Sequence, residues 1–194
     1  MNIQEFTNNY LKETSEIAEK IDQQVIFKIA QILQETKKSS GRIFFLGVGG
    51  GAASASHATN DFNKIAKIPT ICLSDNIGLL TALTNDEGWD SVFKRQLEMH
   101  KLNSNDCLFI YSVGGGSETT SRNLVLAIEY AKQIGAKILG VVGKETGATA
   151  KNADACVIVP KINEKAIIPH TEDYQLIIDH LITNLLAQLE HEQQ

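Results

Sequence analysis

The segment Arg42–Asp61, RIFFLGVGGGAASASHATND, decides the fold of this chain, because an apolar strand runs directly into a glycine-rich turn and then a helix. Residues 43–46 are branched or aromatic, which is typical of a strand that a sheet buries on both faces. Gly49, Gly50 and Gly51 let the backbone turn sharply and approach a ligand closely. The helix that follows presents backbone N–H groups at its start, so the turn is a potential anion site.

Two polar side chains on this helix, His57 and Asp61, lie four residues apart. On a helix this spacing puts them on one face, where they could bind a metal ion or a sugar hydroxyl together. The alternative is an ordinary surface ion pair, because short motifs have a high false-positive rate. The glycine turn is also open to a purely structural interpretation, since its G-x-G-G-G pattern is not the six-residue dinucleotide fingerprint.

Strand-like and helical segments alternate along the rest of the chain. The strand-like runs are residues 43–46, 69–73, 107–111, 137–142 and 156–159. Helical spacing covers residues 3–37, 53–64, 77–98, 118–134 and 171–190, with a weaker pattern at 146–152. This alternation predicts an α/β fold built on a doubly wound, five-stranded parallel sheet of the flavodoxin-like type. We expect one domain over residues 1–194, with an N-terminal helical segment, residues 1–40, and a C-terminal helix added to it.

A second glycine-rich turn, SVGGGSETTS, follows the third strand at residues 112–121. In a doubly wound sheet, ligands bind beyond the carboxyl ends of the strands, so the turns after the first and third strands are the expected ligand site. Free backbone amides and hydroxyls without a P-loop lysine suit a phosphomonoester. The polar and glycine positions that we expect at the phosphate are Ser112, Gly114, Ser117, Thr119 and Thr120. The alternative is that Ser117 or Thr119 only caps the following helix.

The C-terminal helical segment, HTEDYQLIIDHLITNLL, carries a further carboxylate and histidine, Glu172 and His180. They are eight residues apart, a little over two turns, so they point to the same side of the helix. His180 stands among isoleucines and leucines, as core or interface histidines usually do. The carboxylate along the same helix and the His57–Asp61 pair leave an acid/base or zinc role equally open.

The composition limits the class of ligand. A chain of 194 residues with net charge −5 and no basic stripe is a poor match to a nucleic-acid-binding protein. No apolar run is long enough to cross a membrane, and the N-terminus lacks the pattern of a signal peptide, so we expect a cytoplasmic protein without a membrane partner. Cys72, Cys107 and Cys156 stand in strand-like runs, where a free thiol acts as a small apolar side chain.

Taken together, the glycine turns and helical pairs resemble the sugar isomerase (SIS) domain family over nearly the whole chain. Within that family, the chain is similar to the phosphoheptose isomerases, which interconvert sedoheptulose 7-phosphate and D-glycero-D-manno-heptose 7-phosphate. The first family motif corresponds to Gly47–Gly51 with His57 and Asp61, and the hydroxyl-rich phosphate loop corresponds to Ser112–Ser117. An Asn-Asp turn before an aromatic-containing helix corresponds to Asn85 and Asp86, and the closing helix corresponds to the segment with Glu172 and His180.

The resemblance implies a role for each matching position. Asp61 and His180 would be the acid/base pair of an aldose–ketose isomerase, and zinc would be bound by His57, Asp61, Glu172 and His180. The positions expected to contact a sugar phosphate are Gly49, Gly50, Gly51, Asn85, Asp86, Ser112, Gly114, Ser117, Thr119, Thr120 and Glu172. The resemblance also implies a homotetramer, in agreement with apolar faces on the first and last helices that one sheet of this size would leave uncovered.

The chain departs from the family pattern at several of these positions. Asp61 replaces a glutamate, which shortens the reach of the carboxylate by on the order of 1.5 Å. Gly51, Val113 and Gly114 replace hydroxyl residues, so a phosphate would depend more on backbone amides. The alternative is therefore a non-catalytic SIS protein that binds a sugar phosphate or a protein partner. A phosphosugar hydrolase is less favoured, because no nucleophile–base dyad and no two-metal carboxylate cluster is visible.

Overall fold

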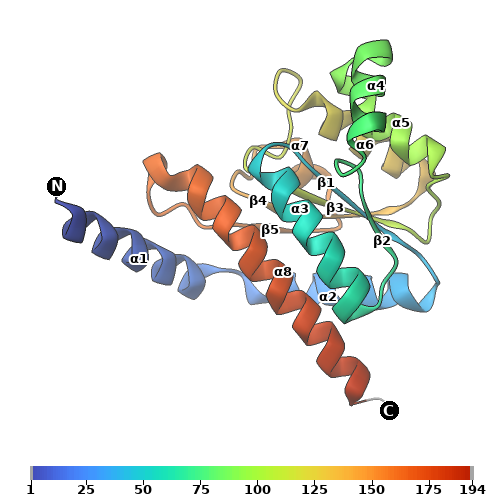
Figure 1. Cartoon of the computed structure of the whole chain (residues 1–194). Coiled ribbons are helices and arrows are strands. Elements are labelled where there is room, and N and C mark those ends of the chain that lie inside the picture. The colour runs from blue at the N-terminus through green and yellow to red at the C-terminus, as the bar shows by residue number, and fades with distance from the viewer. Residues whose placement is uncertain (1, 193–194) are drawn as a thin grey trace.

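A five-stranded parallel sheet forms the centre of the computed structural model, which describes residues 2–192 (Figure 1). The strands are β1 (Ile43–Gly47), β2 (Thr70–Cys72), β3 (Cys107–Ser112), β4 (Lys137–Val142) and β5 (Ala155–Ile158). Their order across the sheet is β2-β1-β3-β4-β5, and every neighbouring pair is parallel. The predicted doubly wound sheet is confirmed. Its order reverses between β1 and β3, so the two glycine-rich turns lie at the switch point.

Helices cover both faces of the sheet, and each face has its own apolar core. On one face, α2 (Gln23–Lys38), α3 (Gly50–Asp61) and α8 (Ile167–His191) pack on side chains that include Phe45, Phe109 and Tyr111. On the other face, α5 (Val92–Met99) and α6 (Arg122–Ile134) pack on side chains that include Leu108 and Ile110. The faces alternate along β3 because successive strand side chains point to opposite sides. A short helix, α7 (Ala148–Asn152), follows β4.

Several helix boundaries differ from the sequence prediction. The predicted helix at 77–98 is two helices, α4 (Ile77–Glu87) and α5, because Gly88 has a φ of 87° and a short 3-10 turn, Trp89–Ser91, follows it. The C-terminal helix begins at Ile167 instead of 171, since Pro169 is tolerated within the first helical turn. Helix α3 continues after Asp61 into a π-helical turn, Phe62–Ala66.

The N-terminal segment is a helix pair, α1 (Ile3–Lys20) and α2, and α1 extends away from the sheet beside the start of α8 (Figure 1). Polar contacts fasten α1 to α8: Tyr10 Oη donates to Asp173 at 2.6 Å, and His170 Nε2 lies 2.9 Å from Glu13. Tyr174 adds a hydrogen bond from its hydroxyl to the carbonyl of Thr14. Helix α1 is therefore attached by polar contacts to α8 and by Ile17, which is completely buried in the apolar core that α8 shares with the sheet.

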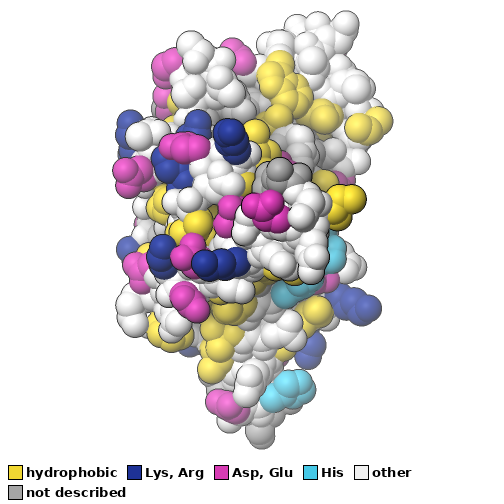
Figure 2. Space-filling view, turned by 90° about the vertical axis from the view of Figure 1, so that its left-hand side faces the viewer, with side chains coloured by type: hydrophobic (Ala, Val, Ile, Leu, Met, Phe, Trp, Pro, Cys, Tyr) yellow, Lys and Arg dark blue, Asp and Glu magenta, His cyan; other side chains and the backbone are white. Residues whose placement is uncertain are grey.

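The surface carries charges of both signs. Lys and Arg side chains lie interspersed with Asp and Glu side chains on the face that Figure 2 shows, in line with the mixed charge of the sequence. In residues 2–192 no helix combines the length and the apolar composition that crossing a bilayer requires.

Candidate active site

Two helices, α3 and α8, lie side by side across one face of the sheet and bring three predicted site residues together (Figure 1). His57 Nε2 lies 2.9 Å from His180 Nε2 and 3.4 Å from Asp61 Oδ2. His180 Nε2 lies 3.5 Å from the same Asp61 oxygen. The second oxygen of Asp61 accepts a hydrogen bond from Asn60 Nδ2 at 2.9 Å, which leaves Oδ2 directed at the two imidazoles.

A fourth member of this cluster, Asp179, was not predicted from the sequence. It precedes His180 on α8, and its Oδ2 atom lies 3.9 Å from His57 Nε2. One ligand atom from each of His57, Asp61, Asp179 and His180 falls within 4.8 Å of the others. The sequence did offer a signal for Asp179, because it is a carboxylate inside the apolar run LIIDHLI. A charge that such a run buries requires a partner.

Two of the spacings in this cluster fit a tetrahedral metal site. Zinc binds histidine nitrogen and carboxylate oxygen at about 2.0–2.2 Å, so tetrahedral ligand atoms lie about 3.3–3.6 Å from one another. The distances from His57 to Asp61 and from His180 to Asp61 are 3.4 and 3.5 Å, whereas His57 lies closer to His180, at 2.9 Å, and farther from Asp179, at 3.9 Å. Two nitrogens and two carboxylate oxygens are also a suitable donor set for such an ion.

Burial divides the cluster into an open and a closed side. The side chains of His57 and His180 are 45% and 52% exposed, whereas that of Asp179 is completely buried. Burial, with a smaller effect from the charge of Asp61, raises the pKa of Asp179 from 3.8 to about 7. A cation in the cluster would offset this electrostatic cost, and a substrate could approach it only from the histidine side.

The predicted role of Glu172 as a metal ligand does not match this geometry and needs correction. Its carboxylate lies over the start of α3, where a Cβ added to Gly50 would come within 2.4 Å of it. Eight residues separate Glu172 from His180, which is about 12 Å along a helix axis, and the N-terminus of α3 favours an anion. Asp179 occupies the fourth position of the cluster instead, while Glu172 lies at the predicted substrate-binding glycines.

The two glycine-rich turns adjoin each other, as predicted for the switch point. A Cβ added to Gly51 would lie 2.4 Å from the carbonyl oxygen of Tyr111, so the start of α3 touches the end of β3. Gly49 has a φ of 62°, and Gly115 and Gly116 have φ values of 72° and 82°. These backbone conformations are accessible to glycine and strained for other residues.

Hydroxyl groups in the second turn stabilise the turn and do not cap α6. Ser112 Oγ accepts a hydrogen bond from the Gly115 amide at 3.0 Å, and Ser117 Oγ accepts one from the Thr120 amide at 3.1 Å. Helix α6 begins after Ser121, which makes no side-chain capping bond, so the alternative of a cap from Ser117 or Thr119 does not apply. Ser117, Thr119 and Thr120 are exposed, as is Gly114, and their contact with phosphate stays a prediction.

Asn85 and Asp86 lie away from a turn, in the last part of α4. Both are exposed, and Asn85 Nδ2 donates to Asp86 Oδ1 at 2.7 Å. The predicted Asn-Asp turn is therefore wrong, because the chain reverses only at Gly88, where φ is positive. A substrate contact from this helix also stays a prediction.

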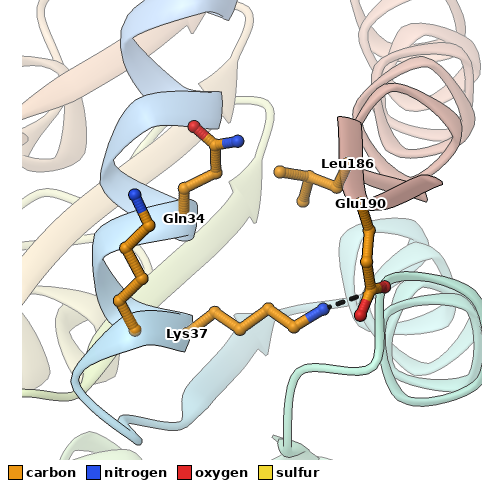
Figure 3. A pocket seen from close by; sticks show the side chains of 5 residues that line it. Gln34, Lys37, Leu186 and Glu190 are labelled. Carbon is orange, nitrogen blue, oxygen red and sulfur yellow. Dashed lines mark ion pairs between the residues drawn. The ribbon is translucent and has the colours of Figure 1, made fainter. Parts of the chain in front are cut away.

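A surface hollow of about 220 Å³ lies elsewhere, between α2 and the end of α8 (Figure 3). Gln34, Lys37 and Glu190 line it, and Lys37 Nζ pairs with Glu190 at 3.2 Å. Glu190 is ten residues beyond His180, which corresponds to about 15 Å along the helix. Because its central charges already pair with each other, this hollow is a weaker candidate for binding an anionic substrate than the glycine turns.

This chain is similar to known proteins both in sequence and in fold. Residues 6–143 match the SIS domain family. The lincomycin biosynthesis protein LmbN of Streptomyces lincolnensis is 34% identical over 161 residues, which are 79% of this chain and only 58% of LmbN. The phosphoheptose isomerase of Rhodospirillum rubrum is 30% identical over 166 residues, which cover 83% of this chain and 84% of that protein. A solved phosphoheptose isomerase from Francisella tularensis has the same fold, with a TM-score of 0.83 at 22% identity over 97% of this chain and 100% of that one.

Proposed function

Because the chain belongs to the SIS domain family, we propose that it is a phosphosugar isomerase that interconverts sedoheptulose 7-phosphate and D-glycero-D-manno-heptose 7-phosphate. The observation that carries this proposal is the meeting of Asp61 and His180, 3.5 Å apart, at the open side of the four-residue cluster. An aldose–ketose isomerisation needs one group to remove a proton beside a carbonyl and another to return a proton to the neighbouring carbon. A carboxylate and an imidazole at one site meet this need.

The two groups differ in setting, which supports a division of roles. Asp61 is nearly buried, and Asn60 fixes its carboxylate, so it is suited to accept the substrate proton in a defined direction. His180 is half exposed, so a proton on the imidazole nitrogen that does not face the cluster can exchange with solvent, and this side chain is suited to serve the second carbon and its oxygen.

The cofactor that we propose is zinc, bound by His57, Asp61 and His180 with Asp179 as the fourth ligand. The fit rests on the 3.4 and 3.5 Å ligand spacings and on the buried carboxylate oxygens of Asp179, which make no hydrogen bond in residues 2–192. A bound zinc ion would supply Lewis-acid polarisation of the substrate carbonyl. Placement of the reacting carbons would come from binding at the far end of the sugar.

That far end is the phosphate, which we place at the second glycine turn. The exposed hydroxyls of Ser117, Thr119 and Thr120 provide neutral donors there, and the backbone of Gly49–Gly51, where the Glu172 carboxylate already lies, would contact the sugar instead. Glu172 at the start of α3 is then available to accept hydrogen bonds from sugar hydroxyls. Binding energy from the phosphate would hold the reacting carbons in register with Asp61 and His180.

The test is turnover on a panel of ketose and aldose phosphates, with and without added zinc. Asp61→Asn and His180→Ala should each lower turnover by ~10²–10⁴, the range for loss of a general acid or base. His191→Ala, an exposed histidine on the same helix, is the matched control and should leave turnover unchanged. Sugar-phosphate binding without turnover on any member of the panel would favour the non-catalytic alternative.

A cytoplasmic homotetramer is the assembly that we propose. Phe6 and Leu11 on α1 are 56% and 61% exposed, and Ile177 and Leu181 on α8 are each 43% exposed. Covering these side chains in an oligomer would remove apolar surface from water. Light scattering that shows a monomer at micromolar concentration would contradict this assembly.

A further inference from the structure

A group of buried polar atoms belongs to α8, which carries Asp179 and His180, and to β3, which packs against α8. Tyr111, Gln175 and Asp179 are each completely buried. The Tyr111 hydroxyl, both amide atoms of Gln175 and both carboxylate oxygens of Asp179 make no hydrogen bond to any residue from 2 to 192. Five such atoms in one region are unusual, because buried polar atoms nearly always have partners.

The three residues come from two elements that pack against each other. Gln175 and Asp179 are four residues apart on α8 and therefore share one face of the helix. Tyr111 stands on β3, where its ring lies 5.2 Å from the rings of Phe45 and Phe109. Burial, together with the charge of Asp179, raises the pKa of Tyr111, so this phenol stays protonated and remains a donor.

The hydrogen-bonding capacities of the three side chains are complementary. A tyrosine hydroxyl and a glutamine amide can both donate, and an ionised carboxylate only accepts. Packing alone does not require these polar atoms, since phenylalanine and leucine would fill similar volumes in an otherwise apolar layer. Each buried polar atom left without a partner destabilises the folded state, so a purely structural layer would be more stable without these atoms.

We propose that Tyr111 and Gln175 are positioning residues that hold the Asp179 carboxylate toward a divalent cation in the cluster. One oxygen of Asp179 lies 3.9 Å from His57, and the phenol and the amide, which make no hydrogen bond of their own, would donate to the carboxylate once it turns toward the ion. Partners of this kind set the orientation and basicity of a ligand. This inference rests on the metal site of the proposed function but not on its substrate.

The experiment measures zinc affinity of the full chain by competition with a chelator, without any sugar phosphate. Tyr111→Phe and Gln175→Leu should each weaken zinc binding by about 10–100-fold, as loss of a second-layer partner does elsewhere. The absorption spectrum of the cobalt-substituted protein should also change, because the geometry at the ion changes. Tyr111→Phe keeps the ring, so melting temperatures should show that this variant is folded.

Tyr174→Phe is the matched control. Tyr174 is also buried and lies on α8, but its hydroxyl donates to the carbonyl of Thr14 on α1. This variant should lower the melting temperature by about 2–4 °C and leave zinc affinity unchanged. If Tyr111→Phe and Gln175→Leu bind zinc as tightly as the wild type, or no more weakly than Tyr174→Phe does, the positioning role is overturned. Absence of turnover would count against the isomerase proposal alone, because the affinity measurement uses no substrate.

Discussion

Asp179→Asn should stabilise the metal-free protein at neutral and alkaline pH. The wild-type carboxyl has its pKa raised from 3.8 to about 7 by burial and by Asp61, so the folded state binds its proton more tightly than the unfolded state does. A group of this kind makes the free energy of unfolding fall as pH rises from about 4 to about 7, after which the loss is complete. A shift of roughly three pKa units corresponds to about 4 kcal/mol, an upper bound because the surroundings can relax.

The assay is urea unfolding in the presence of a chelator at pH 5 and at pH 8. Wild-type protein should lose a few kcal/mol between these pH values, and Asp179→Asn should lose much less. Adding zinc at pH 8 should restore the stability of the wild type and affect the variant only weakly, since the variant lacks one anionic ligand. Equal pH dependence of wild type and variant in chelator would refute the assignment of a buried, electrostatically strained carboxyl to Asp179.

Three other substitutions test the remaining parts of the site. Gly51→Ala should lower the free energy of unfolding by about 2 kcal/mol or more in thermal melts, because the new Cβ would lie 2.4 Å from a backbone oxygen of β3. Gly78→Ala in α4 is the control: its Cβ would meet its nearest atom at 3.6 Å, so this variant should be neutral or stabilising. Thr119→Ala should raise KM for a sugar phosphate and leave the melting temperature unchanged, and an unchanged KM would remove this exposed hydroxyl from the phosphate site. The hydrogen bond from His170 lowers the pKa of Glu13 below 4.5, so the contribution of Glu13 to docking of α1 is complete above pH 4.5 and is lost as pH falls through the lowered value. The protection factors of amides in α1, which correct for the pH dependence of intrinsic exchange, should therefore fall in acid, and in Glu13→Gln they should already be lower at neutral pH.

The sheet was predictable because its strands are short apolar runs separated by glycine turns and helical spacing. The same periodicity explains what was missed near the cluster. His57, Asp61 and His180 follow recognisable spacings, but Asp179 falls at a position that a helical pattern assigns to the core. Glu172 was placed in the metal set by the family resemblance, to which its spacing from His180 added only an angular position on the helix. Its distance from the other ligands depends on how α8 lies against α3. Tyr111 gave no signal, because a tyrosine in a strand is ordinary.

The prediction of a single helix at 77–98 was wrong for a local reason. The pattern of apolar residues continues across Gly88, but the positive φ of that residue and the 3-10 turn after it, Trp89–Ser91, separate α4 from α5. Sequence periodicity cannot show that a glycine uses its left-handed freedom at a given position.

The supply of ligands from α3 and α8 has a consequence for biosynthesis. Two of the four cluster residues lie at positions 57 and 61, and the other two lie at 179 and 180, after every strand of the sheet. While the ribosome still holds the last helix, the emerging chain can begin to form its sheet but has only half of the donor set. Binding of the proposed metal ion would therefore be a late event in synthesis, and a nascent chain truncated before α8 would not compete with finished protein for the ion.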